Sequence, residues 1–221
     1  MPLIILRPQP GADRTAGKAA QMGLDARVCP LFEAHPRNWD APPPDGFDAL
    51  LLTSAQTVRM AGPGLDLYRA LPAYAVGQTT AAAMRQAGFD AVVAGETDGS
   101  AIAARIAADG RRSVLHLTGA HSARIEPGPL ALQRITTYAM VETQNPALDP
   151  LLREEAVLMV HSPRAGERLS SLIPAERRAQ LHVVAISAAA LAACGAGWAS
   201  TRAAELPDDD RMLALARRLC E

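Results

Sequence analysis

The chain has 221 residues, 49% of them hydrophobic, and a formal net charge of -1. This apolar content is enough to build a core and excludes a disordered chain, while the balanced charge excludes a general nucleic-acid binder, which needs a basic excess. No apolar run reaches the roughly 18 residues of a membrane span and the first residues lack the basic segment of a signal peptide, so we expect a cytoplasmic protein with no nucleic-acid or membrane partner.

The apolar runs predicted as strands alternate with alanine-rich helical stretches. In chain order the strands are Leu3–Leu6, Ala26–Cys29, Ala49–Leu52, Ala73–Val76, Ala91–Ala94 and Ser113–Leu117. The predicted helices are 13–22, Ser54–Met60, Gln78–Ala87 and Ser100–Ala108. Short buried strands between helices are typical of a parallel sheet covered on both faces, so the predicted fold class is α/β.

Two proline-rich breaks interrupt this alternation, at 30–44 and at 126–129. The stretch Ile135–Thr143 that follows the second break is β-like. Asn145 and Pro146 then predict the N-cap and the first residue of a new helix, because these residue types are preferred at those two positions.

Cysteine and lysine usage argues against several cofactors. The three cysteines are too few and too scattered for a disulfide framework or a zinc site. Lys18 is the only lysine, and no glycine pattern of a phosphate-binding loop precedes it. Pyridoxal, Schiff-base and P-loop chemistry each need a lysine in a particular setting, so we expect no cofactor and no metal.

An internal repeat divides the chain. Leu50–Ser54 is similar to Leu158–Ser162, and Ala75–Ala81 is similar to Ala185–Leu191. Two further blocks keep the same order, and the offset stays at about 110 residues. Four blocks in order predict two similar α/β domains, each with a parallel sheet flanked by helices.

Each repeat places polar residues where a strand ends and a helix begins. Ligands of parallel sheets bind beyond these strand ends, where helix N-termini suit carboxylates and phosphates. Simpler structural roles stay open: Ser54 and Ser162 as N-caps, Arg7 in a surface salt bridge, and Tyr138 as a packing residue. The three aspartates 208–210 are expected to form a solvated helix start.

Taken in order, these motifs resemble the uroporphyrinogen-III synthase family. The segments that carry the resemblance are Leu6–Pro8, Leu52–Val58, Ala75–Ala81, Gly88–Phe89, Tyr138 and His161–Pro163. The resemblance implies one domain from both chain ends, 1–33 plus 146–221, and a second domain of 38–130. It also implies that the linker crossings 28–37 and 131–145 join them as a two-stranded β-like connection.

The same resemblance implies an enzyme that cyclises hydroxymethylbilane to uroporphyrinogen III, with loss of water and inversion of the last pyrrole ring. The implied partner is this small molecule alone, bound by a monomer without cofactor. Tyr138 matches the tyrosine that helps the hydroxyl leave. The substrate-binding positions are Arg7, Thr53, Ser54, Gly77, Thr79, Thr80, His161, Ser162, Ser187 and Ala188.

The second repeat departs from the family pattern. Ser187 and Ala188–Ala190 stand where a glycine and threonines are usual, and His161 stands where threonine is common. These departures keep a second hypothesis open, a non-catalytic tetrapyrrole-binding or anion-binding sensor of the same fold, because fold does not fix function. A third hypothesis is an unrelated two-domain sugar or anion binder.

Overall fold

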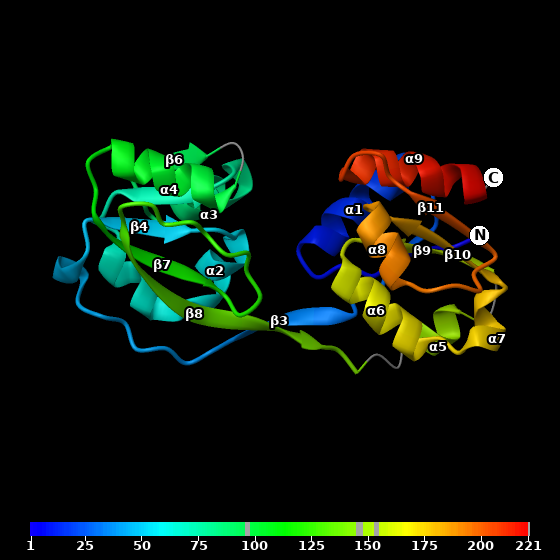
Figure 1. Cartoon of the computed structure of the whole chain (residues 1–221). Coiled ribbons are helices and arrows are strands. Elements are labelled where there is room, and N and C mark those ends of the chain that lie inside the picture. Colours follow the sequence, from blue (N-terminus) through cyan, green and yellow to red (C-terminus); the bar gives the residue numbers. More distant parts are fainter. Residues whose placement is uncertain (96–97, 145–147, 153–154, 221) are drawn as a thin grey trace. The chain divides into compact units, whose positions relative to one another are not determined.

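The computed structural model describes residues 1–95, 98–144, 148–152 and 155–220. The chain forms two compact units (Figure 1): unit 1 comprises Met1–Glu33 and Glu142–Glu221, and unit 2 comprises Ala34–Val141. Each unit is a sheet of mainly parallel strands flanked by helices, which confirms the predicted α/β fold class.

Unit 1 contains a five-stranded sheet in the order β11-β10-β9-β1-β2, with all four strand pairs parallel. Its strands are β1 (Leu3–Ile5), β2 (Ala26–Val28), β9 (Ala156–Val160), β10 (Leu181–Ala185) and β11 (Ser200–Ala203). Its helices are α1 (Gly11–Gln21), α5 (Leu148–Leu151), α6 (Pro163–Leu172), α7 (Ala175–Arg178), α8 (Ala188–Ala193) and α9 (Asp209–Cys220). Buried residues of α1 and α9 share one core with Leu3, Ile5, Val157 and Met159, so these two helices cover the same face of the sheet.

Unit 2 is organised around a six-stranded sheet in the order β3-β8-β7-β4-β5-β6. The strands are β3 (Phe32–Pro36), which begins at the boundary of the unit, β4 (Ala49–Leu52), β5 (Ala73–Val76), β6 (Val92–Gly95), β7 (Ser113–Gly119) and β8 (Ala131–Glu142). The helices are α2 (Ala55–Met60), α3 (Gln78–Gln86) and α4 (Gly99–Ala108), with 3-10 helices η1 (Pro44–Gly46) and η2 (Gly62–Tyr68).

The two faces of this sheet are covered by different elements. Residues of η2 and α3 pack on the face that carries Leu50 and Leu52. Residues of α4 pack on the other face, together with Ile125 and Leu130 from the segment between β7 and β8. Both faces of β4 are therefore buried, and this explains why the strand reads as a continuous apolar run in the sequence.

Strand β8 lies beside β3, as expected of a two-stranded connection, but it is also part of the unit 2 sheet. Residues 131–145 were expected to form a linker crossing, but residues 131–138 pair in parallel with β7 from Ser113↔Ala131 to Gly119↔Tyr138. The first residues of β8, Ala131–Arg134, have no β-like pattern of their own, so pairing with β7 makes them a strand. Asn145 and Pro146, expected to begin a helix, lie outside the described residues.

The internal repeat corresponds to a shared topology. The order β11-β10-β9-β1-β2 of unit 1 matches β6-β5-β4-β7-β8 of unit 2. Ser162 and Ser54 cap the equivalent helices α6 and α2, each accepting a backbone N–H bond on its Oγ. One connection differs: α1 joins β1 to β2, whereas residues 120–130 between β7 and β8 form no helix.

Candidate functional site

Two threonines mark the carboxyl edge of the unit 2 sheet. The pairing of β4 with β7 runs to Leu52 and Leu117, and the next residues are Thr53 and Thr118. Their hydroxyl oxygens lie 3.3 Å apart. Ser54 follows at once and uses its hydroxyl to cap α2, accepting from the backbone N–H of Gln56 at 3.1 Å. The hydroxyls predicted from the first repeat thus gather at one edge, with that of Ser54 already used as a cap.

A cavity of about 520 Å³ opens at this edge. It is lined by the strand ends of β4, β5 and β7, the start of α4, part of the segment 120–130, and one residue of β8. The lining residues are Thr53, Ser54, Val76, Asp98, Gly99, Ser100, Thr118, His121, Ser122, Ala123, Arg124, Ile125 and Tyr138. The segment 120–130 stands where unit 1 has the helix α1, and this irregular backbone forms one wall of the cavity.

Tyr138 supplies the phenol of this cavity. It is 9% exposed, and it pairs with Gly119 just after an irregularity in the β7–β8 register. Its ring lies against Gly119, because a Cβ atom built there would be 2.5 Å from Cζ of the tyrosine. Within the described part of the chain, the hydroxyl of Tyr138 has no hydrogen-bond partner. The cavity therefore contains a hydroxyl donor that no acceptor among the described residues occupies.

The other predicted residues of unit 2 lie outside the cavity lining. Gly77 is the N-cap of α3 with φ of 82°, a left-handed conformation that favours glycine. Thr79 and Thr80 lie in the first turn of that helix, Thr79 exposed and Thr80 buried. The structure thus brings Thr53, Ser54 and Tyr138 together and places the Gly77 turn beside them, beyond β5.

The strand edge of unit 1 contains the remaining predicted residues. Ser162 caps α6 through the N–H of Ala165 at 3.2 Å. Ser187 caps α8 through the N–H of Ala190, also at 3.2 Å, and Ala188 is the first residue of that helix. The Ser187 hydroxyl therefore caps α8, whereas the equivalent helix α3 begins at Gly77 without a side-chain cap.

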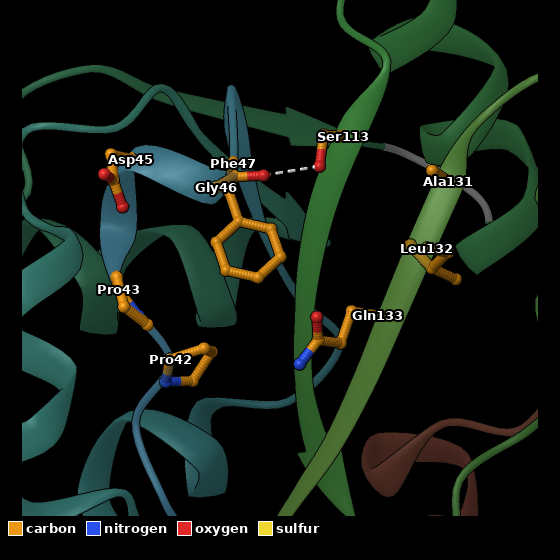
Figure 2. A pocket seen from close by; sticks show the side chains of 9 residues that line it. All are labelled: Pro42, Pro43, Asp45, Gly46, Phe47, Ser113, Ala131, Leu132 and Gln133. Atoms are coloured by element: carbon orange, nitrogen blue, oxygen red, sulfur yellow. Dashed lines mark hydrogen bonds between the residues drawn. The ribbon is translucent and has the colours of Figure 1, made fainter.

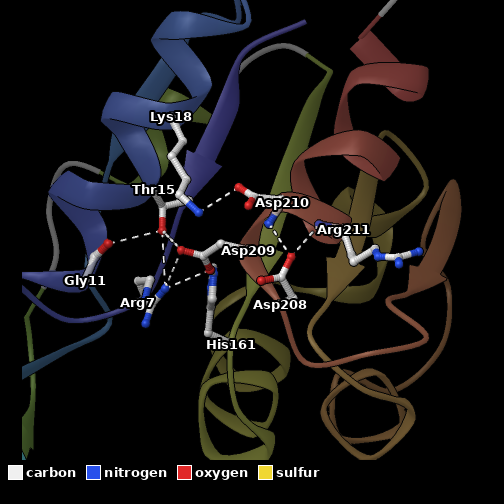
Figure 3. Close-up of polar contacts among 9 residues, drawn as sticks. All are labelled: Arg7, Gly11, Thr15, Lys18, His161, Asp208, Asp209, Asp210 and Arg211. Atoms are coloured by element: carbon white, nitrogen blue, oxygen red, sulfur yellow. Dashed lines mark hydrogen bonds and ion pairs between the residues drawn. The ribbon is translucent and has the colours of Figure 1, made fainter. Parts of the chain in front are cut away.

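Arg7 and His161 belong to an ion cluster that the sequence did not indicate (Figure 3). Both carboxylate oxygens of Asp209 lie 2.8 Å from Nη1 of Arg7, and one of them accepts a bond from the Thr15 hydroxyl at 2.8 Å. Nε2 of His161 lies 3.1 Å from the other oxygen. Because the carboxylate only accepts, His161 donates from Nε2. The side chains of Arg7, Asp209 and His161 are 25%, 15% and 6% exposed.

The expectation of a solvated helix start at 208–210 is wrong for Asp209. Asp208 caps α9 through the N–H groups of Asp210 and Arg211, and Asp210 faces solvent next to Lys18. Asp209 instead turns inward. Burial raises the pKa of its carboxyl, but hydrogen bonds from His161 and Thr15 and the charge of Arg7 outweigh burial and hold that pKa well below its usual range. One sequence signal could have indicated this role of Asp209. It is an acidic first helical residue in a domain where basic residues, Arg7 and His161, directly follow two strands.

A second cavity in unit 2, of about 580 Å³, lies at the opposite end of the strands (Figure 2). Its walls include Ser113 and Ala131, which begin β7 and β8, and the prolines Pro42 and Pro43. The lining offers one carboxylate, Asp45, and the hydroxyl of Ser113 already donates to the carbonyl of Gly46 at 2.7 Å. This cavity offers far less acid-base chemistry than the cavity at the carboxyl edge, whose lining includes Asp98, His121, Arg124 and Tyr138.

The described residues contain neither a candidate metal cluster nor a helix suited to a membrane. No group of three or more histidine, cysteine, aspartate or glutamate side chains is placed to hold a metal ion in residues 1–95, 98–144, 148–152 and 155–220. No helix within those same ranges is long and apolar enough to cross a membrane.

One family model and several solved structures are similar to this chain. The family model described as uroporphyrinogen-III synthase HemD matches residues 13–214. The fold is similar to uroporphyrinogen-III synthetase from Helicobacter pylori, with a TM-score of 0.69 and 18% identity over 99% of this chain and 100% of that one. A mutant uroporphyrinogen III synthase from Thermus thermophilus matches with a TM-score of 0.47 and 15% identity over 100% and 99% of the two chains. No curated protein sequence matches the chain.

Proposed function

The chain belongs to the uroporphyrinogen-III synthase HemD family, and we propose that it catalyses the reaction named by that family. The substrate is hydroxymethylbilane and the product is uroporphyrinogen III. The observation that carries the proposal is the cavity at the carboxyl edge of unit 2, where the Tyr138 hydroxyl has no protein partner within the described residues.

The chemical step that this cavity suits is departure of the substrate hydroxyl. The electron-rich pyrrole pushes electrons toward the carbon that bears the hydroxyl, and the C–O bond breaks. A donor on the leaving oxygen stabilises the charge that develops there, and the oxygen leaves as water once it has gained a proton. A tyrosine hydroxyl has a proton that it can donate to the leaving oxygen. We assign this role to Tyr138.

Most polar groups of the lining suit a polyanion; the exception is Asp98, whose carboxylate caps α4. Hydroxymethylbilane has eight carboxylates, and the lining offers the hydroxyls of Thr53, Ser100 and Ser122 with the guanidinium of Arg124. Arg134 reaches the same wall, because its Nη2 donates to the Ser122 hydroxyl at 2.7 Å. Hydrogen bonds from charged donors to carboxylates are stronger than neutral ones, so these groups favour an anionic ligand over a neutral one of the same shape.

The proposal also includes substrate-binding positions at three helix starts. They are Gly77, Thr79 and Thr80 at α3, Ser162 at α6, and Ser187 and Ala188 at α8. Each of these positions offers a hydroxyl or a backbone N–H at a strand edge, the position where ligands of parallel sheets bind. Backbone donors need no particular side chain, so the missing threonines after Ser187 do not remove this mode of binding.

The alternative is a protein that binds tetrapyrroles or anions without turnover, favoured by Ala188–Ala190 in place of the usual residues of the second motif. A rate measurement separates the two. Freshly prepared hydroxymethylbilane is mixed with the protein, and its consumption is followed against a buffer blank. The proposal expects consumption well above the blank, in proportion to protein concentration. Binding without acceleration would support the sensor instead.

A further inference from the structure

The two units have the same strand order but fill the equivalent edge differently. By the strand pairing, His161 and Arg7 lie next to each other just beyond β9 and β1. Thr53 and Thr118 occupy the same positions beyond β4 and β7 in unit 2. Unit 2 therefore has two small neutral hydroxyls where unit 1 has two large nitrogen donors.

The helix starts correspond in the same way. Asp98 accepts bonds from the backbone N–H groups of residues 100 and 101, and Asp208 accepts them from residues 210 and 211. Each aspartate is followed by the first residue of a long helix, Gly99 in α4 and Asp209 in α9. Gly99 has no side chain to extend into the edge, and a Cβ there would lie 2.7 Å from Ile125. Asp209 does extend into the edge of unit 1.

Asp209 is surrounded as a bound carboxylate would be. Its two oxygens receive bonds from the Arg7 guanidinium, the Thr15 hydroxyl and the His161 imidazole, at 2.8, 2.8 and 3.1 Å (Figure 3). The donors come from three different elements: the end of β1, the helix α1, and the end of β9. Gly11 allows Arg7 to lie in place, because a Cβ at position 11 would be 2.6 Å from Nε of the arginine.

We propose that Arg7, Thr15 and His161 form a carboxylate-binding site in unit 1, and that the chain's own Asp209 is its occupant. In unit 2 the equivalent edge is the open cavity, whereas in unit 1 this internal carboxylate lies among the donors. The consequence for the substrate rests on the proposed function: its carboxylates find the Arg7 guanidinium already engaged by Asp209.

The site is tested by removing its occupant and supplying a free one. Asp209→Ala keeps Cβ and removes the carboxylate, so the missing atoms correspond to formate, which is the probe. The variant and the natural protein are melted in formate and in chloride of equal ionic strength, and unfolding is followed by circular dichroism. At ten times its Kd, a ligand of the folded state raises the folding constant about 11-fold. For a chain of this size that corresponds to a rise in Tm of about 3–6 °C.

The expected result is a formate-specific rise for Asp209→Ala and none for the natural protein, whose site is filled. Asp210→Ala is the matched control, because Asp210 is an exposed neighbour whose carboxylate pairs with Lys18. It should show no formate-specific rise. Asp209→Asn keeps the volume of the side chain and should lose stability without gaining the response, because the space stays filled.

A double variant shows where formate binds. Adding Arg7→Ala to Asp209→Ala removes the main donor, so the formate response should disappear while the protein stays folded. The proposal is overturned if Asp209→Ala responds equally to formate and chloride, if it fails to fold even in formate, or if the natural protein shows the same rise. None of these readouts involves hydroxymethylbilane, so this result and the failure of the proposed reaction can be told apart.

Discussion

The ring of Tyr138 lies directly on Gly119, so close that a Cβ atom at position 119 would be 2.5 Å from Cζ of the tyrosine and 2.8 Å from its hydroxyl oxygen. The two residues are partners in the β7–β8 pairing, just past its irregularity. The absence of a side chain on β7 therefore fixes where the phenol of β8 lies in the cavity.

Gly119→Ala should therefore impair turnover by displacing Tyr138. Misplacing a reacting group by about 1 Å costs up to about 10²-fold in rate, so we expect a loss of about 10-fold to 10²-fold in kcat with hydroxymethylbilane. Gly46→Ala is the matched control, because nothing lies within 4 Å of a Cβ built at that position in the same unit. Full activity of Gly119→Ala would mean that the position of the ring does not matter.

Tyr138→Phe should lower turnover and leave the fold intact. Assistance by a general acid is typically worth about 10²–10⁴-fold, and we expect the low end because the pyrrole already drives the hydroxyl out. Tyr68→Phe is the control: its hydroxyl donates to the Pro42 carbonyl at 2.7 Å, outside the cavity lining, so its loss should affect stability rather than rate.

The competing assignment of the acid is His161 in unit 1. His161→Ala should leave hydroxymethylbilane turnover within a few-fold of normal once the protein is folded, because its Nε2 is engaged by Asp209. Single-turnover rates of His161→Ala and Tyr138→Phe distinguish the two assignments of the acid. If His161→Ala abolishes turnover while Tyr138→Phe keeps near-full rate and selectivity, the chemistry belongs to unit 1.

Arg7→Ala should destabilise the protein, which differs from the sequence-based expectation that Arg7 acts mainly in substrate binding. The change leaves the Asp209 carboxylate without its cation in a partly buried position. Breaking a fully buried pair costs about 3–5 kcal/mol, and partial exposure reduces this to about 1–3 kcal/mol. Urea unfolding measures it. Arg27→Ala removes an exposed pair with Asp25 and should cost less than about 1 kcal/mol. An equal loss in the free energy of unfolding for Arg7→Ala and Arg27→Ala would contradict a stabilising role of the Arg7–Asp209 pair.

His116 should make unit 2 less stable in acid. It is 1% exposed on β7, and burial, with a smaller contribution from Arg134, lowers the pKa of its imidazole from 6.5 to about 4. Between these values the unfolded chain binds the proton and the folded chain does not, so the free energy of unfolding falls as pH drops from 6.5 toward 4. The loss is about 3 kcal/mol at most.

The check is His116→Leu, which cannot take up a proton. Neither ring nitrogen of His116 has a hydrogen-bond partner in the described residues, so the change removes no bond. Its unfolding free energy, measured by urea titration from pH 4 to pH 7, should vary less than that of the natural protein. Parallel pH profiles for the two proteins would show that His116 is not the group responsible.

The sequence predicted the strands that are buried on both faces better than any other feature. Ala49–Leu52 and Ala73–Val76 have the predicted bounds because an apolar run and a following turn residue mark both. The helix starts at Ser54 and Ser162 were equally readable, since each cap is a local interaction. The sequence alone did not decide whether these two serine hydroxyls cap a helix or bind a ligand.

What the sequence did not reveal depends on contacts between distant residues. Ala131–Arg134 become strand because β7 lies beside them, and nothing in those four residues favours a strand. Arg7 and Asp209 are 202 positions apart, so their pairing follows only from the fold that closes unit 1 from both chain ends. The cavity likewise depends on an irregular segment, 120–130, at a place where unit 1 has a helix.

The isomer ratio of the product tests the central claim most directly. Hydroxymethylbilane closes spontaneously to the type I ring, so formation of the type III ring reports catalysis rather than mere consumption. The protein is freed of metal with a chelator, no nucleotide is added, and the product isomers are separated after a single turnover. We expect mainly the type III isomer, with the type I share rising in Tyr138→Phe. Type I product alone, formed at the rate of the buffer blank, would contradict it.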